Sequence, residues 1–261
     1  MPMRNNGWVT TCRLDLLPVR KNALSAGDKP LMSVGDGFDG MQSVVPKGLP
    51  VAFVFDLDGT LLNTLPDLTA ITNRVLETHG YPRRTIEEIR SFIGDGAKLL
   101  IRRSFPQSAS DEECAVALAE WKAGYAEHDQ GLTQPYEGIP EVLAELRENG
   151  CKLGVLSNKF DAAVKQLVGC YFLETFDIAQ GESPDCPPKP NPQGLKGLIA
   201  DLGMLPGQTI YVGDSAGDMK VAKAAGAMAI GVSWGYQPVK SLGLAGADMI
   251  IDDPHQLVRF V

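Results

Sequence analysis

Two hydrophobic patterns alternate along most of the chain. Residues 51–55 are all apolar and, except for Ala52, β-branched or aromatic, as expected of a strand that is covered on both faces in a parallel sheet. Between such runs, apolar residues recur with the period of an α-helix. The alternation predicts an α/β fold with a doubly wound, Rossmann-like parallel sheet. Further strands are predicted at 152–156, 176–179, 209–212, 228–232 and 248–251.

One long stretch contains helical patterns only. Pro66 is suited to open a helix that Gly80 closes. Because the stretch separates the first two strands, we interpret residues 65–135 as an inserted helical bundle, a cap over the sheet. Residues 50–64 and 136–261 would then form the α/β core. Additional helices of the cap are predicted at 86–92, 97–104 and 111–127.

The first 49 residues follow neither pattern. They mix Gly, Pro, Ser and Asn with scattered charges, which predicts a mobile N-terminal extension outside the folded unit. Met41 lies ten residues before the first strand, and we hypothesise that the functional protein begins there.

Composition narrows the class of protein. The 261 residues are 44% hydrophobic, which is enough to form one hydrophobic core and a smaller second domain. A net charge of −8 argues against a nucleic-acid partner, and no apolar run approaches the length of a membrane span. We therefore expect a cytoplasmic protein with no membrane partner, either a monomer or a homodimer.

Polar residues follow the predicted strands at their carboxyl ends. Asp56 and Asp58 come directly after the first strand, and because side chains alternate along a strand, both can point to one side. Gly59 permits a sharp turn, and the Thr60 hydroxyl can tie that turn to a nearby carboxylate. Parallel strands bring their carboxyl ends to one edge of the sheet, where ligands bind. The other residues expected at this edge are Ser157, Asn158, Asp214 and Asp218, with Lys189 in a proline-rich loop.

Each of these features alone also has a structural explanation. An isolated Asp-x-Asp-Gly is often a solvated turn, and a lone Lys189 would usually face solvent. Ser157 could cap a helix that begins near Lys159. Asp214 and Asp218 could mark the start of a helix. Their joint occurrence, in this order along the chain, favours one shared site.

The order of the motifs resembles the haloacid dehalogenase (HAD) superfamily over residues 51–261. The resemblance implies a hydrolase that carries Mg²⁺. The chemistry agrees, because crowded carboxylates repel one another and a hard cation with oxygen ligands relieves that repulsion. The implied metal ligands are the Asp56 carboxylate, the Asp58 carbonyl and Asp214, with Asp218 in support. The matching motifs are Asp56-Leu-Asp-Gly-Thr60, Ser157, Lys189-Pro190 and Gly213-Asp-Ser-Ala-Gly-Asp218.

The same resemblance implies a division of catalytic roles. Asp56 would attack phosphorus and form an aspartyl phosphate, while Asp58 would protonate the leaving group and then activate water. Ser157, the Asn158 amide and Lys189 would hold the phosphoryl oxygens. Thr60 is a further candidate for substrate binding. An acid at position 58 favours phosphate esters, because the dehalogenating members of the family lack it.

The predicted cap is similar to that of phosphoglycolate phosphatases. The signal is the segment Phe92-Ile-Gly-Asp-Gly-Ala-Lys98, followed by Arg102 and Arg103. We predict that Lys98 or one of these arginines binds the carboxylate of 2-phosphoglycolate, a small phosphorylated metabolite. Asn63 and Thr64 depart from the usual Asp and Ser of the family, which leaves the substrate preference open. Alternatives are another capped phosphatase, a phosphosugar mutase or a phosphoacceptor signalling module.

Overall fold

The computed structural model describes residues 51–128 and 131–261. The predicted N-terminal extension, residues 1–49, and the proposed start at Met41 lie outside the described residues.

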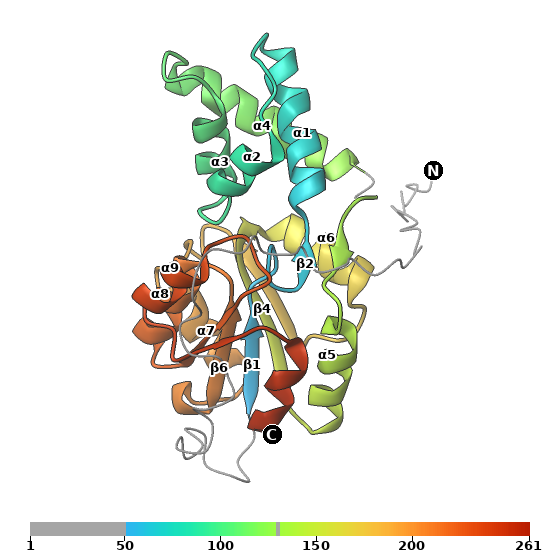
Figure 1. The fold of residues 1–261 in the computed structure, drawn as a ribbon, viewed down its shortest axis with the longest axis vertical. Helices are drawn as coiled ribbons and strands as arrows, with labels where there is room; N and C mark the ends of the chain where they lie inside the picture. Colours follow the sequence, from blue (N-terminus) through green and yellow to red (C-terminus); the bar gives the residue numbers. More distant parts are fainter. Residues whose placement is uncertain (1–50, 129–130) are drawn as a thin grey trace, which may run out of the picture.

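A parallel sheet occupies the centre of the described chain (Figure 1). Its order is β5-β4-β1-β6-β7-β8, so the chain proceeds from β1 to one side and later to the other. The backbone of Ala52 is in register with Lys152 of β4 and with Thr209 of β6. This reversal beside β1 opens a crevice at the carboxyl ends of the strands. The strands are β1 (Ala52–Phe55), β4 (Lys152–Phe160), β5 (Ile178–Glu182), β6 (Thr209–Gly213), β7 (Met228–Val232) and β8 (Met249–Ile251).

Helices cover both faces of the sheet, as the doubly wound prediction requires. Phe53 and Phe55 of β1 pack into one core with α5, α6 and the 3₁₀ helix η3. Ala52 and Val54 point to the other face, against α7, α8 and α9. The absence of polar residues from β1 follows from this double cover. The bounds are α5 (Ile139–Glu148), α6 (Asp161–Tyr171), α7 (Gln193–Asp201), η2 (Pro206–Gln208), α8 (Ala216–Ala225), α9 (Val239–Leu244) and η3 (Pro254–Phe260).

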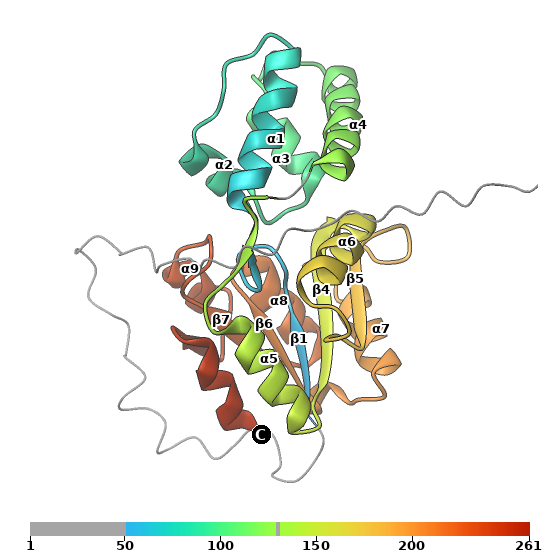
Figure 2. The same cartoon turned by 90° about the vertical axis from the view of Figure 1, so that its right-hand side faces the viewer.

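Four helices form a separate layer above the carboxyl ends of the strands (Figures 1 and 2). Within the described residues they are α1 (Leu65–Thr78), α2 (Ile86–Phe92), α3 (Ala97–Ser104) and α4 (Asp111–Glu127). The layer has its own apolar core, which includes Ile71, Ile101 and Trp121. The Thr85 side chain and Glu88 form a capping box that fixes the start of α2.

Two short antiparallel strands join this helical layer to the sheet. β2 (Leu62–Asn63) leads into the layer and β3 (Gln134–Pro135) leads out, with Leu62 opposite Pro135. The two strands were not predicted, because two residues carry no detectable period.

Some element boundaries differ from the predictions. Strand β4 continues to Phe160, beyond the predicted end at Leu156, with an irregular register against β5. Helix α6 consequently begins at Asp161, so Ser157 does not cap it. Helix α8, whose start Asp214 and Asp218 indicated, begins at Ala216, because Ser215 is its N-cap and pairs with Asp218 in a capping box.

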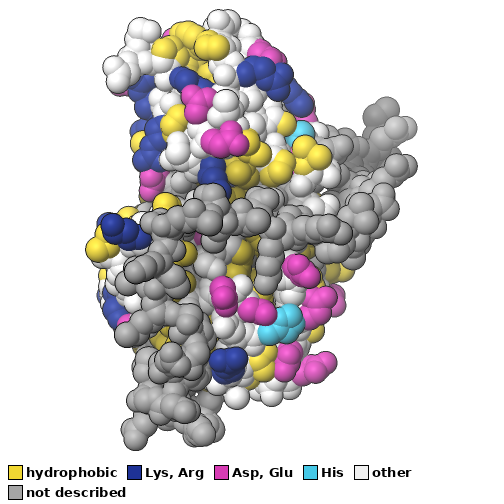
Figure 3. All heavy atoms as spheres, in the orientation of Figure 1, with side chains coloured by type: hydrophobic (Ala, Val, Ile, Leu, Met, Phe, Trp, Pro, Cys, Tyr) yellow, Lys and Arg dark blue, Asp and Glu magenta, His cyan; other side chains and the backbone are white. Residues whose placement is uncertain are grey.

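The outer surface carries both signs of charge. On the face in Figure 3, basic and acidic side chains both occur over the helical layer. No helix in the described ranges has the length and apolar character needed to cross a bilayer.

Candidate functional site

Asp56 and Asp58 lie where β1 ends and the chain turns sharply. The Leu57 carbonyl accepts hydrogen bonds from the amides of Thr60, Leu61 and Leu62, which closes the turn. Gly59 has φ of 85°, and a Cβ at this position would overlap the Asp214 carboxylate. A glycine is therefore required both by the backbone and by the close approach of the neighbouring acid.

Three aspartates, from the ends of β1 and β6 and from the first turn of α8, converge at this point. Carboxylate oxygens of Asp56, Asp214 and Asp218 all lie within 4.8 Å of one another, although Asp56 is remote in sequence from the other two. Burial, followed by the nearby carboxylates of Asp218 and Asp56, raises the pKa of Asp214 well above its ordinary value. The Tyr236 amide donates to Asp214 Oδ2 at 2.6 Å and so holds this carboxylate in place. The predicted convergence of acids far apart in the chain is confirmed.

Lys189 bridges two of these acids. Its Nζ lies 2.9 Å from Asp56 Oδ1 and 2.6 Å from Asp218 Oδ1, and it donates to the Tyr211 hydroxyl at 3.1 Å. Burial raises the pKa of the Asp56 carboxyl group, whereas the nearby Lys189 lowers it. Because the Asp218 carboxylate also raises it, the pKa of Asp56 is about 6. Burial lowers the pKa of Lys189, but Asp218 and Asp56 outweigh this and raise it well above normal. Lys189 therefore stays protonated and supplies one positive charge to the three buried carboxyl groups.

The cluster fits a cation with oxygen ligands. Three buried carboxylates face one ammonium group, so an additional positive charge would lower the cost of ionising Asp56 and Asp214. Asp218 is placed differently, because Lys189 and Tyr211 donate to Oδ1 and the amide and hydroxyl of Ser215 donate to Oδ2. The geometry suits Asp56 and Asp214 for direct contact with a metal and Asp218 for support through Lys189.

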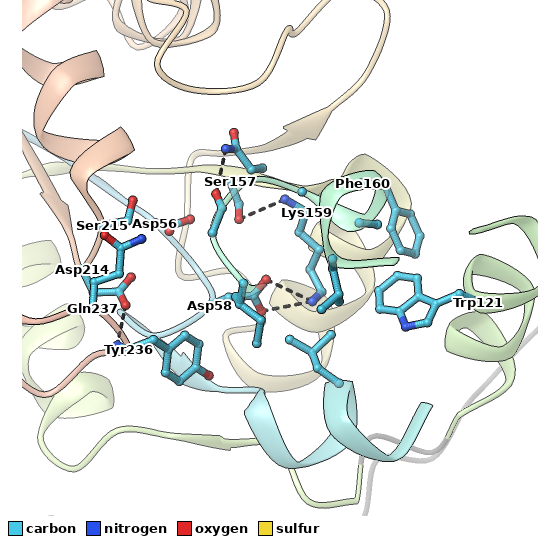
Figure 4. Close-up of a pocket in the computed structure, with 17 residues that line it drawn as sticks. Asp56, Asp58, Trp121, Ser157, Lys159, Phe160, Asp214, Ser215, Tyr236 and Gln237 are labelled. Atoms are coloured by element: carbon cyan, nitrogen blue, oxygen red, sulfur yellow. Dashed lines mark hydrogen bonds and ion pairs between the residues drawn. The ribbon is translucent and has the colours of Figure 1, made fainter. Parts of the chain in front are cut away.

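A pocket of about 570 Å³, including its open mouth, separates the acids from the helical layer (Figure 4). Its floor contains Asp56, Asp58, Ser157 and Asp214. Asn158 joins the two sides, because its side-chain amide donates to the Gly94 carbonyl at 2.9 Å and accepts from the Lys189 amide at 2.7 Å. The apolar wall consists of Leu68, Ile93, Ala97, Leu100, Trp121 and Phe160.

Lys159 forms an ion pair with Asp58 inside this pocket. Its Nζ lies 3.0 and 3.1 Å from the two carboxylate oxygens, and 4.7 Å from the centre of the Tyr125 ring. The Thr64 hydroxyl also donates to Asp58 Oδ1, at 2.6 Å. Burial lowers the pKa of Lys159, but Asp58 and then Tyr125 outweigh it, so the pKa rises to about 12. The pocket therefore holds a permanent positive charge beside Asp58.

Three predicted substrate-binding residues lie elsewhere. Lys98 is exposed on α3 and does not line the pocket. The Arg102 guanidinium donates to carbonyls of the loop after α3, including those of Pro106 and Ala109. Arg102 lies in the last turn of α3, where basic side chains commonly bind such carbonyls. Arg103 pairs with Asp95 at 2.6 Å.

Thr60 is fully buried, and its hydroxyl donates to Asp214 Oδ1 at 3.4 Å. The hydroxyl therefore ties the turn to a nearby carboxylate, as the sequence predicted.

Other residues of the site were missed by the sequence analysis. Lys159 was considered only as a helix start. Tyr236 lines the pocket and accepts hydrogen bonds from the amides of Thr64 and Leu65. Arg90 of α2 donates to the carbonyls of Gly235 and Tyr236 and so connects the helical layer with the loop beside Asp214. No local pattern marks these residues, since their partners are remote in sequence.

Comparison with known proteins agrees with this geometry. A family model described as haloacid dehalogenase-like hydrolase matches residues 53–232. A phosphoglycolate phosphatase from Pseudomonas putida is 33% identical over 227 residues, which cover 84% of this chain and 82% of the relative. An N-acetylmuramic acid 6-phosphate phosphatase from Pseudomonas aeruginosa is 32% identical over 211 residues, covering 79% and 92% of the two chains.

A solved structure gives the same result for the fold. The crystal structure of a predicted phosphoglycolate phosphatase from Haemophilus somnus matches with a TM-score of 0.75 at 27% identity. The match covers 80% of this chain and 97% of that one.

Proposed function

Because the chain belongs to the haloacid dehalogenase-like hydrolase family, we propose that it is a phosphatase acting on a small phosphorylated metabolite, with 2-phosphoglycolate as the leading candidate. The observation that carries the proposal is the convergence of Asp56, Asp58 and Asp214 on the floor of one pocket. The names of its relatives support the reaction, and the phosphoglycolate phosphatases among them support the substrate.

The proposal includes Mg²⁺ and a cap. Asp56 and Asp214 would hold the ion together with the Asp58 carbonyl, and the bound cation would neutralise the acids and the transferring phosphoryl group. We further propose that residues 65–135 act as the cap over a core formed by residues 50–64 and 136–261. Their place above the carboxyl ends of the strands (Figure 2) is consistent with a lid that excludes water.

The residues around the pocket account for both halves of the reaction. A carboxylate oxygen of Asp56 attacks phosphorus as the ester bond breaks, and Asp58, which has to enter this step as the carboxylic acid, gives its proton to the leaving alkoxide. Asp58 then takes a proton from water, whose oxygen attacks the aspartyl phosphate to release phosphate and regenerate Asp56. Ser157 and the amide of Asn158 are suited to hold the phosphoryl oxygens, and Lys189 keeps Asp56 charged and oriented.

The test is release of inorganic phosphate from a panel of esters, with Mg²⁺ and with EDTA. The panel contains 2-phosphoglycolate, N-acetylmuramic acid 6-phosphate, hexose phosphates and p-nitrophenyl phosphate. We expect Mg²⁺-dependent turnover and a loss of roughly 10⁴-fold in kcat for Asp56→Asn, a change that removes the nucleophile. Transfer between sugar positions without release, or a stable phosphoprotein without turnover, would instead support a mutase or a phosphoacceptor module.

A further inference from the structure

Lys159 is the one lysine or arginine among the residues that line the pocket in the described chain. Its side chain is only 3% exposed, so its ammonium group is buried against the apolar wall rather than solvated. Figure 4 shows it pointing from β4 toward Asp58, with Trp121 and Phe160 beside it. A buried ammonium needs an anionic partner, because an unpaired one is strongly destabilising.

Orientation of Asp58 does not by itself require this lysine. The Thr64 hydroxyl donates to Asp58 Oδ1 at 2.6 Å and already fixes the carboxylate from the other side. The Lys159 ammonium also lies 4.7 Å from the centre of the Tyr125 ring, so a residue of the helical layer holds it in place independently of Asp58. Lys159 is therefore a fixed positive charge at the boundary between the two layers.

We propose that Lys159 recognises a second anionic group on the substrate, a carboxylate attached close to the ester oxygen. This rests on the proposed phosphatase function. Asp58 is the group that meets the leaving oxygen in that reaction, so a cation 3.0 Å from Asp58 lies beside the carbons that carry this oxygen. The apolar wall around it offers no competing charge. Lys159 is then the specificity-determining residue that the sequence analysis sought on α3, and it selects acidic over neutral phosphomonoesters.

The experiment compares two substrates that differ at the relevant position. In 2-phosphoglycolate a carboxylate occupies the place of the methyl group of ethyl phosphate. We measure kcat/KM for both in the presence of Mg²⁺. The wild-type protein should prefer 2-phosphoglycolate by roughly 30-fold, the effect of one charged hydrogen bond in a desolvated site. Lys159→Met keeps the apolar stem and should reduce this ratio to near one.

Matched variants separate recognition from general damage. Lys122→Met removes an exposed lysine that lies 5.7 Å from the ring centre of Phe160, and the ratio should stay at its wild-type value. Lys159→Gln, which keeps a hydrogen-bond donor, is the second variant if the Met variant does not fold. Equal losses on both substrates, with the ratio preserved, would overturn the proposal and leave Lys159 as a positioning residue for Asp58.

The wild-type protein alone provides another decisive outcome. Turnover of p-nitrophenyl phosphate and ethyl phosphate without any preference for 2-phosphoglycolate would refute carboxylate recognition while the phosphatase proposal stands. Failure to hydrolyse any of these esters would refute the phosphatase proposal itself. The two failures are thus distinguishable.

Discussion

The ion pairs of Lys189 should contribute far more to stability than an equally short pair at the surface. Lys189→Met leaves Asp56 and Asp218 without their cation, and their side chains are only 9% and 0% exposed. Removing one partner of a buried pair typically costs about 3–5 kcal/mol, because the remaining charge is uncompensated. The control is Lys223→Met, whose Nζ also lies 2.6 Å from a carboxylate, that of Asp248. Those two side chains are 48% and 30% exposed, so the expected cost is below about 1 kcal/mol.

The assay is urea denaturation followed by circular dichroism, in EDTA so that a bound cation does not replace the missing charge. The free energy of unfolding is taken from the midpoints after checking that the slope is unchanged. If the two variants lose the same stability, the distance between the charged atoms, and not the burial of the pair, determines how much an ion pair contributes to the free energy of unfolding. A loss below about 1 kcal/mol for Lys189→Met would likewise refute the expected effect of burial.

Other contacts give predictions of their own. Arg90→Met should lower kcat/KM by roughly 10-fold with little change in melting temperature, because it removes the hydrogen bonds between the helical layer and the loop beside Asp214. Arg90→Lys should restore part of the lost kcat/KM. Unchanged kinetics would exclude that connection. Tyr236→Phe leaves the first amides of α1 without their acceptor and should cost about 1–3 kcal/mol in urea, so an unaltered midpoint would contradict the bond. Arg102→Ala should cost about 1–2 kcal/mol of stability, because three loop carbonyls each lose one donor, and leave KM for 2-phosphoglycolate unchanged. Lys98→Ala should alter neither quantity, and a higher KM in either variant would support the sequence-based assignment of these residues to substrate binding.

The strands and the acids of the site were predictable because their signals are local. An uninterrupted apolar run such as 51–55 identifies a buried strand, and the residue that ends it must lie at the sheet edge. Asp56 and Asp214 could therefore be brought together without coordinates. The end of β4 was less predictable, because Lys159 is a buried charged residue within a strand, and the polar residues from Ser157 onward indicated the start of a helix instead.

The residues that were missed depend on distant partners. Lys159 and Asp58 are 101 positions apart, and Tyr236 contacts Thr64 across 172 positions. A single sequence contains nothing that links such pairs. The helical pattern of α3 likewise shows that Lys98 and Arg102 are off its apolar face, but not which way that face is turned, so it could not indicate that neither residue lines the pocket.

The pairing of β2 with β3 means that the polypeptide leaves the sheet and returns to it at adjacent points. Leu62 and Pro135 are neighbours in space, although more than seventy positions separate them in the chain. A segment whose two ends already meet can be shortened, exchanged or deleted without pulling the rest of the backbone apart. This connection thus permits the helices above the pocket to be replaced as one segment, and new substrate preferences could arise in that way while the acidic cluster below remains intact.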